Sequence, residues 1–147
     1  PTGAGEPPEL LAALSAQRRC LRDVKVLQLL GLRAFPYLDP ATAEHVRHLA
    51  LFFSGATRPG GEAGWIDFVP NSFGEIPGMI ARRELAADVV FALASPMDGD
   101  GNFALGLGPD YSHAATRVAR AVVLEVNPNV PFACGNCHVH VSQVAAL

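Results

Sequence analysis

Apolar residues in the first part of the chain recur with the spacing of a helix. Residues 9–21 carry leucines at positions 10, 11, 14 and 21, which gives a helix one apolar face. The prolines at positions 7 and 8 are tolerated at a helix start, and Glu6 and Glu9 suit its positive end. The pattern therefore predicts an amphipathic helix over residues 9–21.

Further short helices are predicted later in the chain. Residues 76–85 form one, and residues 112–121 form another with Ser112 as its N-cap. Residues 36–46 are predicted to be a loop that leads into a short helix. The glycine-rich residues 56–64 are predicted to be a turn or a poorly ordered loop.

Apolar segments of strand length alternate with these helices. The run at 88–96 is almost continuously apolar and is bounded by Asp and Pro, as expected of a strand buried on both faces of a parallel sheet. Alternating strands and helices favour right-handed βαβ units. We therefore predict an α/β fold with an open, mainly parallel sheet and flanking helices. Its strands are expected at residues 24–31, 47–55, 65–70, 88–96, 121–131 and 138–144.

Composition narrows the class of protein. The chain has 147 residues, of which 50% are hydrophobic and 17% are charged, and this suits a single folded domain over residues 1–147. No apolar run approaches the roughly 20 residues of a spanning helix, so we expect no membrane segment. The net charge of −3 without a basic cluster argues against nucleic acid as a partner. The three cysteines do not form a disulfide framework, which favours a reducing compartment such as the cytoplasm. Both ends look cut, as in a fragment of a larger polypeptide.

The segment PMDGDGNFALG (96–106) has some features of a calcium loop. Asp98, Asp100 and Asn102 occupy the first, third and fifth positions of an EF-hand pattern. Phe103 stands where that pattern needs glycine, and Pro109 stands where it needs the bidentate glutamate. A tight turn between strands is the preferred interpretation, because Asp-Gly pairs adopt positive φ readily.

The segment CGNCH (134–138) matches the attachment pattern of c-type haem. Together with His140 it could also supply four zinc ligands, namely Cys134, Cys137, His138 and His140. Four ligands within seven residues are cramped, and the α/β pattern does not suit a haem protein. The preferred interpretation is two half-buried thiols in a loop that leads to an edge strand, with no metal bound.

Several segments resemble, in order, one family of enzymes. The runs DVVFALASPMDGDGNFALG (88–106) and ARAVVLEVNPNVP (119–131) are similar to segments of acetyl-CoA hydrolases and of acetate and 4-hydroxybutyrate CoA-transferases. The segment DFVPNSFGEIPGMI (67–80) resembles another, with Gly74 where Ser is usual. Residues 36–55 and 138–147 also fit. The resemblance covers nearly the whole chain, and it favours a loop and hairpin at 96–106 over a metal loop.

The resemblance implies a class I CoA-transferase architecture, in which two open α/β domains hold the active site between them. This chain would be most of the amino-terminal domain. A glutamate of the second domain would attack acyl-CoA and carry CoA as a thioester to a small carboxylate, or to water in the hydrolases. The resemblance therefore implies coenzyme A as a substrate and no permanently bound cofactor. We expect the full-length protein to be a homo-oligomer.

No residue of this chain matches the family's catalytic glutamate, and neither Glu75 nor Glu125 is assigned that role. The segment TGAGEP (2–7) resembles a glycine loop beside the substrate, whose N–H groups could stabilise an oxyanion. Asn127 is expected to orient a neighbouring loop. The residues expected to bind substrate are Gly3, Ala4, Gly5, Asn71, Ser72, Ser95, Pro96 and Asp98.

Two other functions remain open from the residues alone. A truncated relative could act as a binding module for a small acid or a protein partner. A metalloprotein could use the CxxCH region. The residues do not separate a hydrolase from a transferase, because that difference depends on access of water to the cleft.

Overall fold

The computed structural model describes residues 3–147, and its contacts divide them into two compact units. Unit 1 contains Gly3–Pro7 and Ser72–Leu147, and unit 2 contains Pro8–Asn71. Each unit combines parallel strands with helices, which confirms the predicted α/β class. Among the described residues, no helix has the length and apolar character that crossing a bilayer requires.

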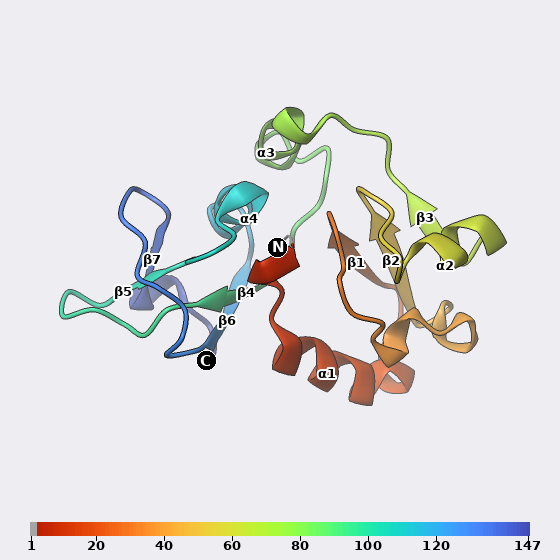
Figure 1. Ribbon diagram of the computed structural model, residues 1–147, viewed down its shortest axis with the longest axis horizontal. Helices are drawn as coiled ribbons and strands as arrows, with labels where there is room; N and C mark the ends of the chain where they lie inside the picture. The colour runs from red at the N-terminus through yellow and green to blue at the C-terminus, as the bar shows by residue number, and fades with distance from the viewer. Residues whose placement is uncertain (1–2) are drawn as a thin grey trace. The chain divides into compact units, whose positions relative to one another are not determined.

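Unit 2 is built on a three-stranded parallel sheet. Its strands are β1 (Val24–Gln28), β2 (Val46–Ala50) and β3 (Ile66–Phe68), which lie side by side in that order (Figure 1). The helices of this unit are α1 (Pro8–Gln17) and α2 (Arg58–Ala63). Short 3₁₀ turns lie at Arg18–Cys20, Pro36–Leu38 and Pro40–Thr42.

The core of unit 2 forms between α1 and one face of the sheet. Leu11 of α1, Tyr37 and Val46 of β2 are buried together. Burial alternates along β2, so Val46 and Ala50 point inward while Arg47 points to the other face. There Arg47 makes a bidentate ion pair with Asp67, at 2.6 and 2.8 Å. The alternation follows from the period of two in a strand.

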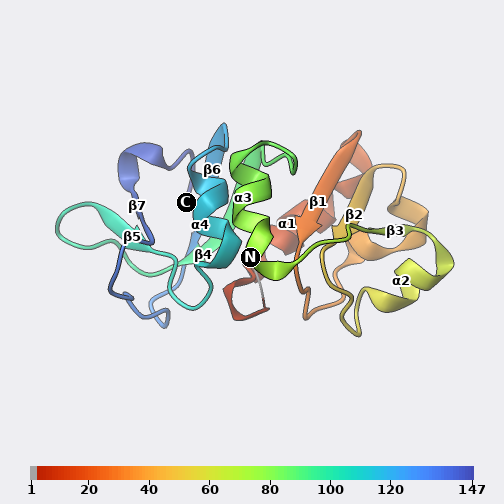
Figure 2. The ribbon, with the colours of Figure 1, turned by 90° about the horizontal axis from the view of Figure 1, so that it is seen from above.

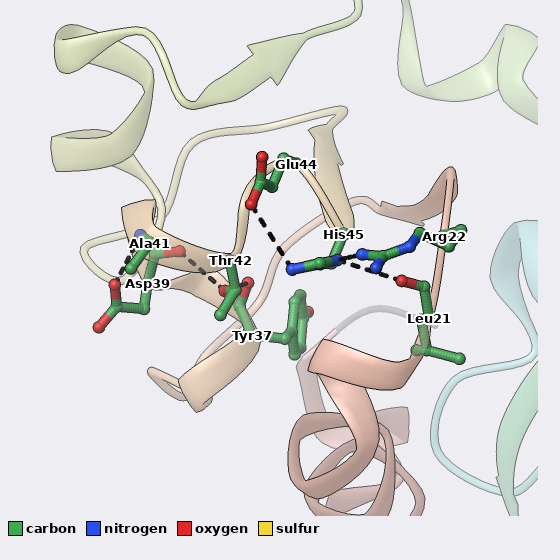
Figure 3. A network of polar contacts seen from close by, with 8 residues as sticks. All are labelled: Leu21, Arg22, Tyr37, Asp39, Ala41, Thr42, Glu44 and His45. Carbon is green, nitrogen blue, oxygen red and sulfur yellow. Dashed lines mark hydrogen bonds and ion pairs between the residues drawn. The ribbon is translucent and has the colours of Figure 1, made fainter.

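The crossover between β1 and β2 is held by local polar contacts (Figure 3). The Thr42 hydroxyl donates to the carbonyls of Tyr37 at 3.3 Å and Asp39 at 2.9 Å. Arg22 donates to His45 Nδ1, and His45 Nε2 lies 3.6 Å from the Glu44 carboxylate. The chain forms two short 3₁₀ helices here, Pro36–Leu38 and Pro40–Thr42, so the short helix predicted within residues 36–46 is present in 3₁₀ form.

The helix α2 corrects the prediction of a loop over residues 56–64. Ser54 N–H donates to the Thr57 hydroxyl at 2.9 Å, and Thr57 N–H lies 3.3 Å from the Ser54 hydroxyl, a reciprocal pair like a capping box. Gly64 ends the helix in the left-handed conformation, with φ of 90°. A Cβ at Gly60 would lie 2.4 Å from Ile66 Cδ1, so this glycine permits close packing of the helix.

Unit 1 contains two small sheets and two helices. The strands β4 (Val89–Ala94) and β6 (Ala121–Val126) pair in parallel, whereas β5 (Asn102–Ala104) and β7 (His138–His140) pair antiparallel. The helices α3 (Ile76–Ala81) and α4 (Asp110–Thr116) pack beside each other (Figure 2). Three-residue 3₁₀ turns lie at Gly3–Gly5, Phe73–Glu75 and Val141–Gln143.

Most predicted elements of unit 1 exist but are shorter than predicted. The strand predicted at 138–144 ends at His140, because His140 and Gln143 form a capping box that starts a 3₁₀ turn. The helix predicted at 112–121 begins at Asp110. Ser112 is therefore not its N-cap. Instead, Ser112 is buried, and its N–H and hydroxyl both donate to the Asp110 carboxylate, at 2.9 and 2.8 Å.

Candidate functional site

The glycine turn, Gly3–Gly5, belongs to unit 1 and lies against β4. Gly3 has a φ of 48°, in the left-handed region that glycine tolerates, and the Glu6 N–H donates to the Gly3 carbonyl at 3.0 Å. Ala4 is exposed, whereas Gly5 is buried. The turn thus lies next to the strand that ends just before Ser95.

The prolines after the glycine turn limit which backbone groups could hold an anion. Helix α1 begins at Pro8, directly after the fully buried Pro7. Neither proline has an N–H, so the helix start lacks donors that an anion-binding helix terminus usually offers. The start of α1 therefore does not provide a helix-terminus site for an anion.

Glu6 is a buried carboxylate that the sequence interpretation did not select. Its side chain is only 5% exposed, and it takes part in a polar interaction within the structure. The sequence placed Glu6 with Glu9 at the positive end of the first helix, but only Glu9 lies in the first turn of α1. The two prolines after Glu6 could have indicated that Glu6 lies outside the helix, because a proline favours the start of a helix and α1 begins at Pro8.

Ser95 and Pro96 begin a hairpin that follows β4. The Ser95 N–H donates to the Ala104 carbonyl at 2.9 Å, and the Ala104 N–H donates to the Ser95 hydroxyl at 3.0 Å. That hydroxyl also donates to the Pro96 carbonyl at 2.9 Å. Ser95 is fully buried, so its side chain anchors the hairpin, whereas Pro96 is exposed.

Asp98 shapes the tip of this hairpin. Its Oδ1 accepts hydrogen bonds from the N–H groups of Asn102 at 2.7 Å and Asp100 at 3.0 Å, and Gly101 adopts a φ of 82°. The Asn102 N–H bond is the main cause that lowers the pKa of Asp98 below its usual value. The predicted turn is thereby confirmed. Oδ1 of this carboxylate is therefore occupied by backbone N–H groups, and Oδ2 lies 3.4 Å from the Asn102 Nδ2.

Asn71 and Ser72 stand at the boundary between the two units. Asn71 belongs to unit 2, where its Nδ2 donates to the carbonyls of Leu51 and Val69, each at 2.8 Å. These carbonyls directly follow β2 and β3, so Asn71 lies at the carboxyl ends of the parallel strands, where α/β sheets bind ligands. Ser72 belongs to unit 1 and is exposed, and its side chain makes no capping bond to the turn that follows.

Asn127 has the orienting role that was predicted for it. Its N–H donates to the Ala94 carbonyl at 3.0 Å, which holds the end of β6 beside the end of β4. Its Oδ1 accepts a hydrogen bond from the Asn129 N–H at 2.9 Å. Asn127 therefore fixes the path of the loop that follows β6.

The CxxCH segment forms the loop before β7. Cys134 is exposed and Cys137 is half-buried, and both are free thiols. The His138 Nε2 donates to the Ala133 carbonyl at 2.8 Å, and His140 Nδ1 is bonded to the Ser142 hydroxyl at 2.8 Å. Within residues 3–147, no three His, Cys, Asp or Glu side chains gather in a way that could hold a metal ion.

The structure brings most of the predicted substrate-binding residues into one unit. The glycine turn, Ser72, Ser95, Pro96 and Asp98 belong to unit 1, and Asn71 belongs to unit 2. The glycine turn contacts β4, the strand that leads directly to Ser95. The glycine turn and the start of the hairpin are therefore both adjacent to β4.

Residues 1–146 match the acetyl-CoA hydrolase/transferase N-terminal domain. The chain belongs to this family. It is 38% identical over 144 residues to a succinyl-CoA:cyclohexane-1-carboxylate CoA transferase of Geobacter metallireducens, and 31% identical over 140 residues to a 4-hydroxybutyrate coenzyme A transferase of Clostridium kluyveri. These matches cover 98% and 95% of this chain but only 32% and 33% of the relatives. The chain thus spans about a third of the length of these relatives.

Solved structures of related proteins have the same fold. RipA from Yersinia pestis superposes with a TM-score of 0.87 at 30% identity, over 99% of this chain and 36% of RipA. A 4-hydroxybutyrate CoA-transferase from Porphyromonas gingivalis gives a TM-score of 0.78 at 25% identity, over 98% of this chain and 32% of that structure. The family suspected from the five sequence segments is therefore confirmed.

Proposed function

We propose that this chain is most of the amino-terminal domain of an acyl-CoA hydrolase or CoA-transferase, and that residues 1–147 act as one domain of that enzyme. The match to the family over residues 1–146 carries the proposal. The relatives named above transfer CoA, and this chain corresponds to about a third of each. A second domain would supply the catalytic glutamate, so the chain alone would be inactive.

In the proposed reaction a glutamate carboxylate attacks the carbonyl of acyl-CoA and releases the CoA thiolate, which leaves an acyl-glutamyl anhydride. The thiolate then attacks the glutamyl carbonyl and releases the acyl group as a carboxylate. The resulting glutamyl-CoA thioester passes CoA to an acceptor carboxylate, or is hydrolysed by water. Each step places negative charge on a former carbonyl oxygen, which N–H donors stabilise.

The residues of this chain would bind and position the substrate. The glycine turn would offer backbone N–H groups to the oxyanion or to the carboxylate, because it lies against β4, the strand that leads to the hairpin. Ser72 and Pro96, which are exposed, would contact the substrate from unit 1. Ser95 would act indirectly, because its buried hydroxyl anchors the start of the hairpin. Asn71 would hold the carboxyl ends of β2 and β3 in unit 2. Asp98 would act indirectly, because its carboxylate holds the hairpin tip.

The partners and setting follow from the same proposal. The substrates would be an acyl-CoA and a small carboxylate, with coenzyme A as a substrate and no permanently bound cofactor. The full-length enzyme would assemble as a homo-oligomer in the cytoplasm.

The test uses the full-length protein with succinyl-CoA and either cyclohexane-1-carboxylate or 4-hydroxybutyrate. We expect the acceptor to appear as its CoA thioester, and we expect intact mass to show one covalently bound CoA when the acceptor is left out. Addition of the acceptor should remove that CoA. Release of free CoA without acceptor would identify a hydrolase. If neither transfer, hydrolysis nor covalent CoA is observed, the proposal is wrong.

A further inference from the structure

The two thiols of the loop before β7 have no part in the proposed reaction. Cys134 is exposed, Cys137 is half-buried, and only two residues separate them. The third cysteine, Cys20, is also exposed but belongs to unit 2. The CxxC pair is therefore a local feature of unit 1 that solvent can reach.

A side-chain hydrogen bond closes this loop. The His138 Nε2 donates to the Ala133 carbonyl at 2.8 Å, so the residues that flank the two cysteines are tied together. Cys134 and Cys137 are the residues directly inside this hydrogen-bonded pair in the sequence. The His138 ring also packs against Phe132, with ring centroids 4.8 Å apart, which fixes the imidazole that makes the bond.

The bend between the cysteines has room to adjust. Gly135 has a φ of 120°, and a Cβ placed on it would meet no atom within 4 Å. A disulfide requires Cα atoms within about 7 Å of each other and a defined torsion about the S–S bond. The hydrogen bond between His138 and Ala133 holds the ends of the loop together, and the open space at Gly135 leaves the bend free to change its torsions.

We propose that Cys134 and Cys137 form a reversible intramolecular disulfide. The oxidant is a small disulfide such as glutathione disulfide. The exposed Cys134 thiolate attacks one of its sulfur atoms, which breaks that S–S bond, releases one thiolate and forms a mixed disulfide. The Cys137 thiolate then attacks Cys134 Sγ and releases the second thiolate. The protein loses two thiol protons and two electrons, and the oxidant becomes two thiols.

The disulfide would act on the hairpin that begins at Ser95. The Leu105 N–H donates to the Cys137 carbonyl at 3.3 Å, and β7 pairs with β5 directly after the loop. A disulfide that fixes the backbone at Cys137 would therefore also restrict the position of β5, which carries Asn102 and Phe103. This link rests on contacts within unit 1 and does not depend on the proposed enzymatic function.

The test equilibrates the full chain with defined mixtures of glutathione and glutathione disulfide, followed by alkylation and peptide mass mapping. We expect one peptide with Cys134 and Cys137 joined, two hydrogens lighter and resistant to alkylation. C20S should oxidise at the same glutathione ratio as the wild type. C137S should stop at a mixed disulfide on Cys134, and C134S should form no intramolecular disulfide.

The role of the closing hydrogen bond is tested with H138V. This variant should require a more oxidising mixture, by about fivefold in the equilibrium constant, which is the size of one ordinary hydrogen bond. A circular dichroism spectrum like that of the wild type would show that β7 persists. The proposal is overturned if wild-type Cys134 and Cys137 each carry glutathione at equilibrium without joining, or if both remain reduced in pure glutathione disulfide.

Discussion

At the scale of single residues, two serines near the predicted site have opposite surroundings. Ser95 is fully buried and its hydroxyl both accepts from the Ala104 N–H and donates to the Pro96 carbonyl. Ser72 is exposed and makes no capping bond. Both were expected to bind substrate, because sequence position does not reveal whether a hydroxyl is already bonded within the protein.

This contrast predicts different effects of the same substitution. S95A should lower the free energy of unfolding by about 1–3 kcal/mol, because it leaves the buried Ala104 N–H unpaired. S72A should leave stability unchanged and lower kcat/KM of the full-length enzyme by about fivefold, as expected for one lost hydrogen bond to substrate. Urea unfolding and CoA-transfer assays measure the two effects.

The exposed Ser142 serves as an activity control for Ser72, because its hydroxyl is bonded to His140 Nδ1 within the protein. S142A should leave kcat/KM of the full-length enzyme unchanged. A stability loss in S72A equal to that in S95A, or an unchanged kcat/KM in S72A, would contradict the assignment of Ser72 to the cleft.

His48 makes the stability of unit 2 depend on pH. The side chain is 2% exposed, and its Nε2 has no hydrogen-bond partner among residues 3–147. Burial lowers the pKa of His48 to about 4, because charging the ring inside the core is unfavourable. In the unfolded chain the histidine pKa is about 6.5. Below that pH the unfolded state gains a proton that the folded state does not.

The free energy of unfolding should therefore fall as the pH is lowered from about 6.5 to 4, by up to roughly 3 kcal/mol from this residue. H48F should remove this part of the pH dependence, which urea unfolding at several pH values measures. Y37F is the control. It removes the hydroxyl 3.3 Å from His48 Nδ1 but keeps the ring buried, so the slope should remain. An unchanged slope in H48F would refute this explanation.

At the scale of elements, the periodic segments were predicted well and the capped ends were not. The apolar runs predicted β1, β2, β4 and β6, since parallel strands covered on both faces consist of nearly continuous apolar residues. The helix α2 was missed because its glycines and proline were taken as loop residues. The helix begins there because Ser54 and Thr57 exchange hydrogen bonds just before it. Gly60 lets the helix pack closely against Ile66 of β3, a strand that follows later in the chain.

The packing of α2 gives a prediction of its own. G60A raises helix propensity by up to about 1 kcal/mol, but its methyl group would lie 2.4 Å from Ile66 Cδ1 and 2.6 Å from Ile66 Cγ1. Ile66 is buried, so the strand cannot yield freely. We expect a net loss of about 1–3 kcal/mol in the free energy of unfolding. G55A is the control, because its Cβ meets nothing within 4 Å. A stabilised G60A would disprove the close contact.

At the scale of the whole molecule, sequence order does not reveal the division into units. Unit 1 is discontinuous, since it takes Gly3–Pro7 from the start of the chain and Ser72–Leu147 from the rest. Local patterns describe neighbours in sequence, so they could place the glycine turn before a helix but not against β4. The resemblance to a family located the candidate residues, and the structure then showed which of their side chains are already bonded to the backbone, such as Ser95 and Asp98.

Each unit has its own core, which predicts separate responses to substitution. Leu11, Tyr37 and Val46 form the core of unit 2, while Val122 and Leu124 are buried on β6 of unit 1. Trp65 is the only tryptophan, and its Nε1 donates to the Leu38 carbonyl at 3.2 Å within unit 2, so its fluorescence reports on that unit. G60A should shift the Trp65 transition in urea and leave amide hydrogen exchange on β6 unchanged. S95A should increase amide hydrogen exchange on β6 and leave the Trp65 transition in urea unchanged. If each variant shifts both signals equally, the two cores unfold as a single cooperative unit and the expectation of independent unfolding is wrong.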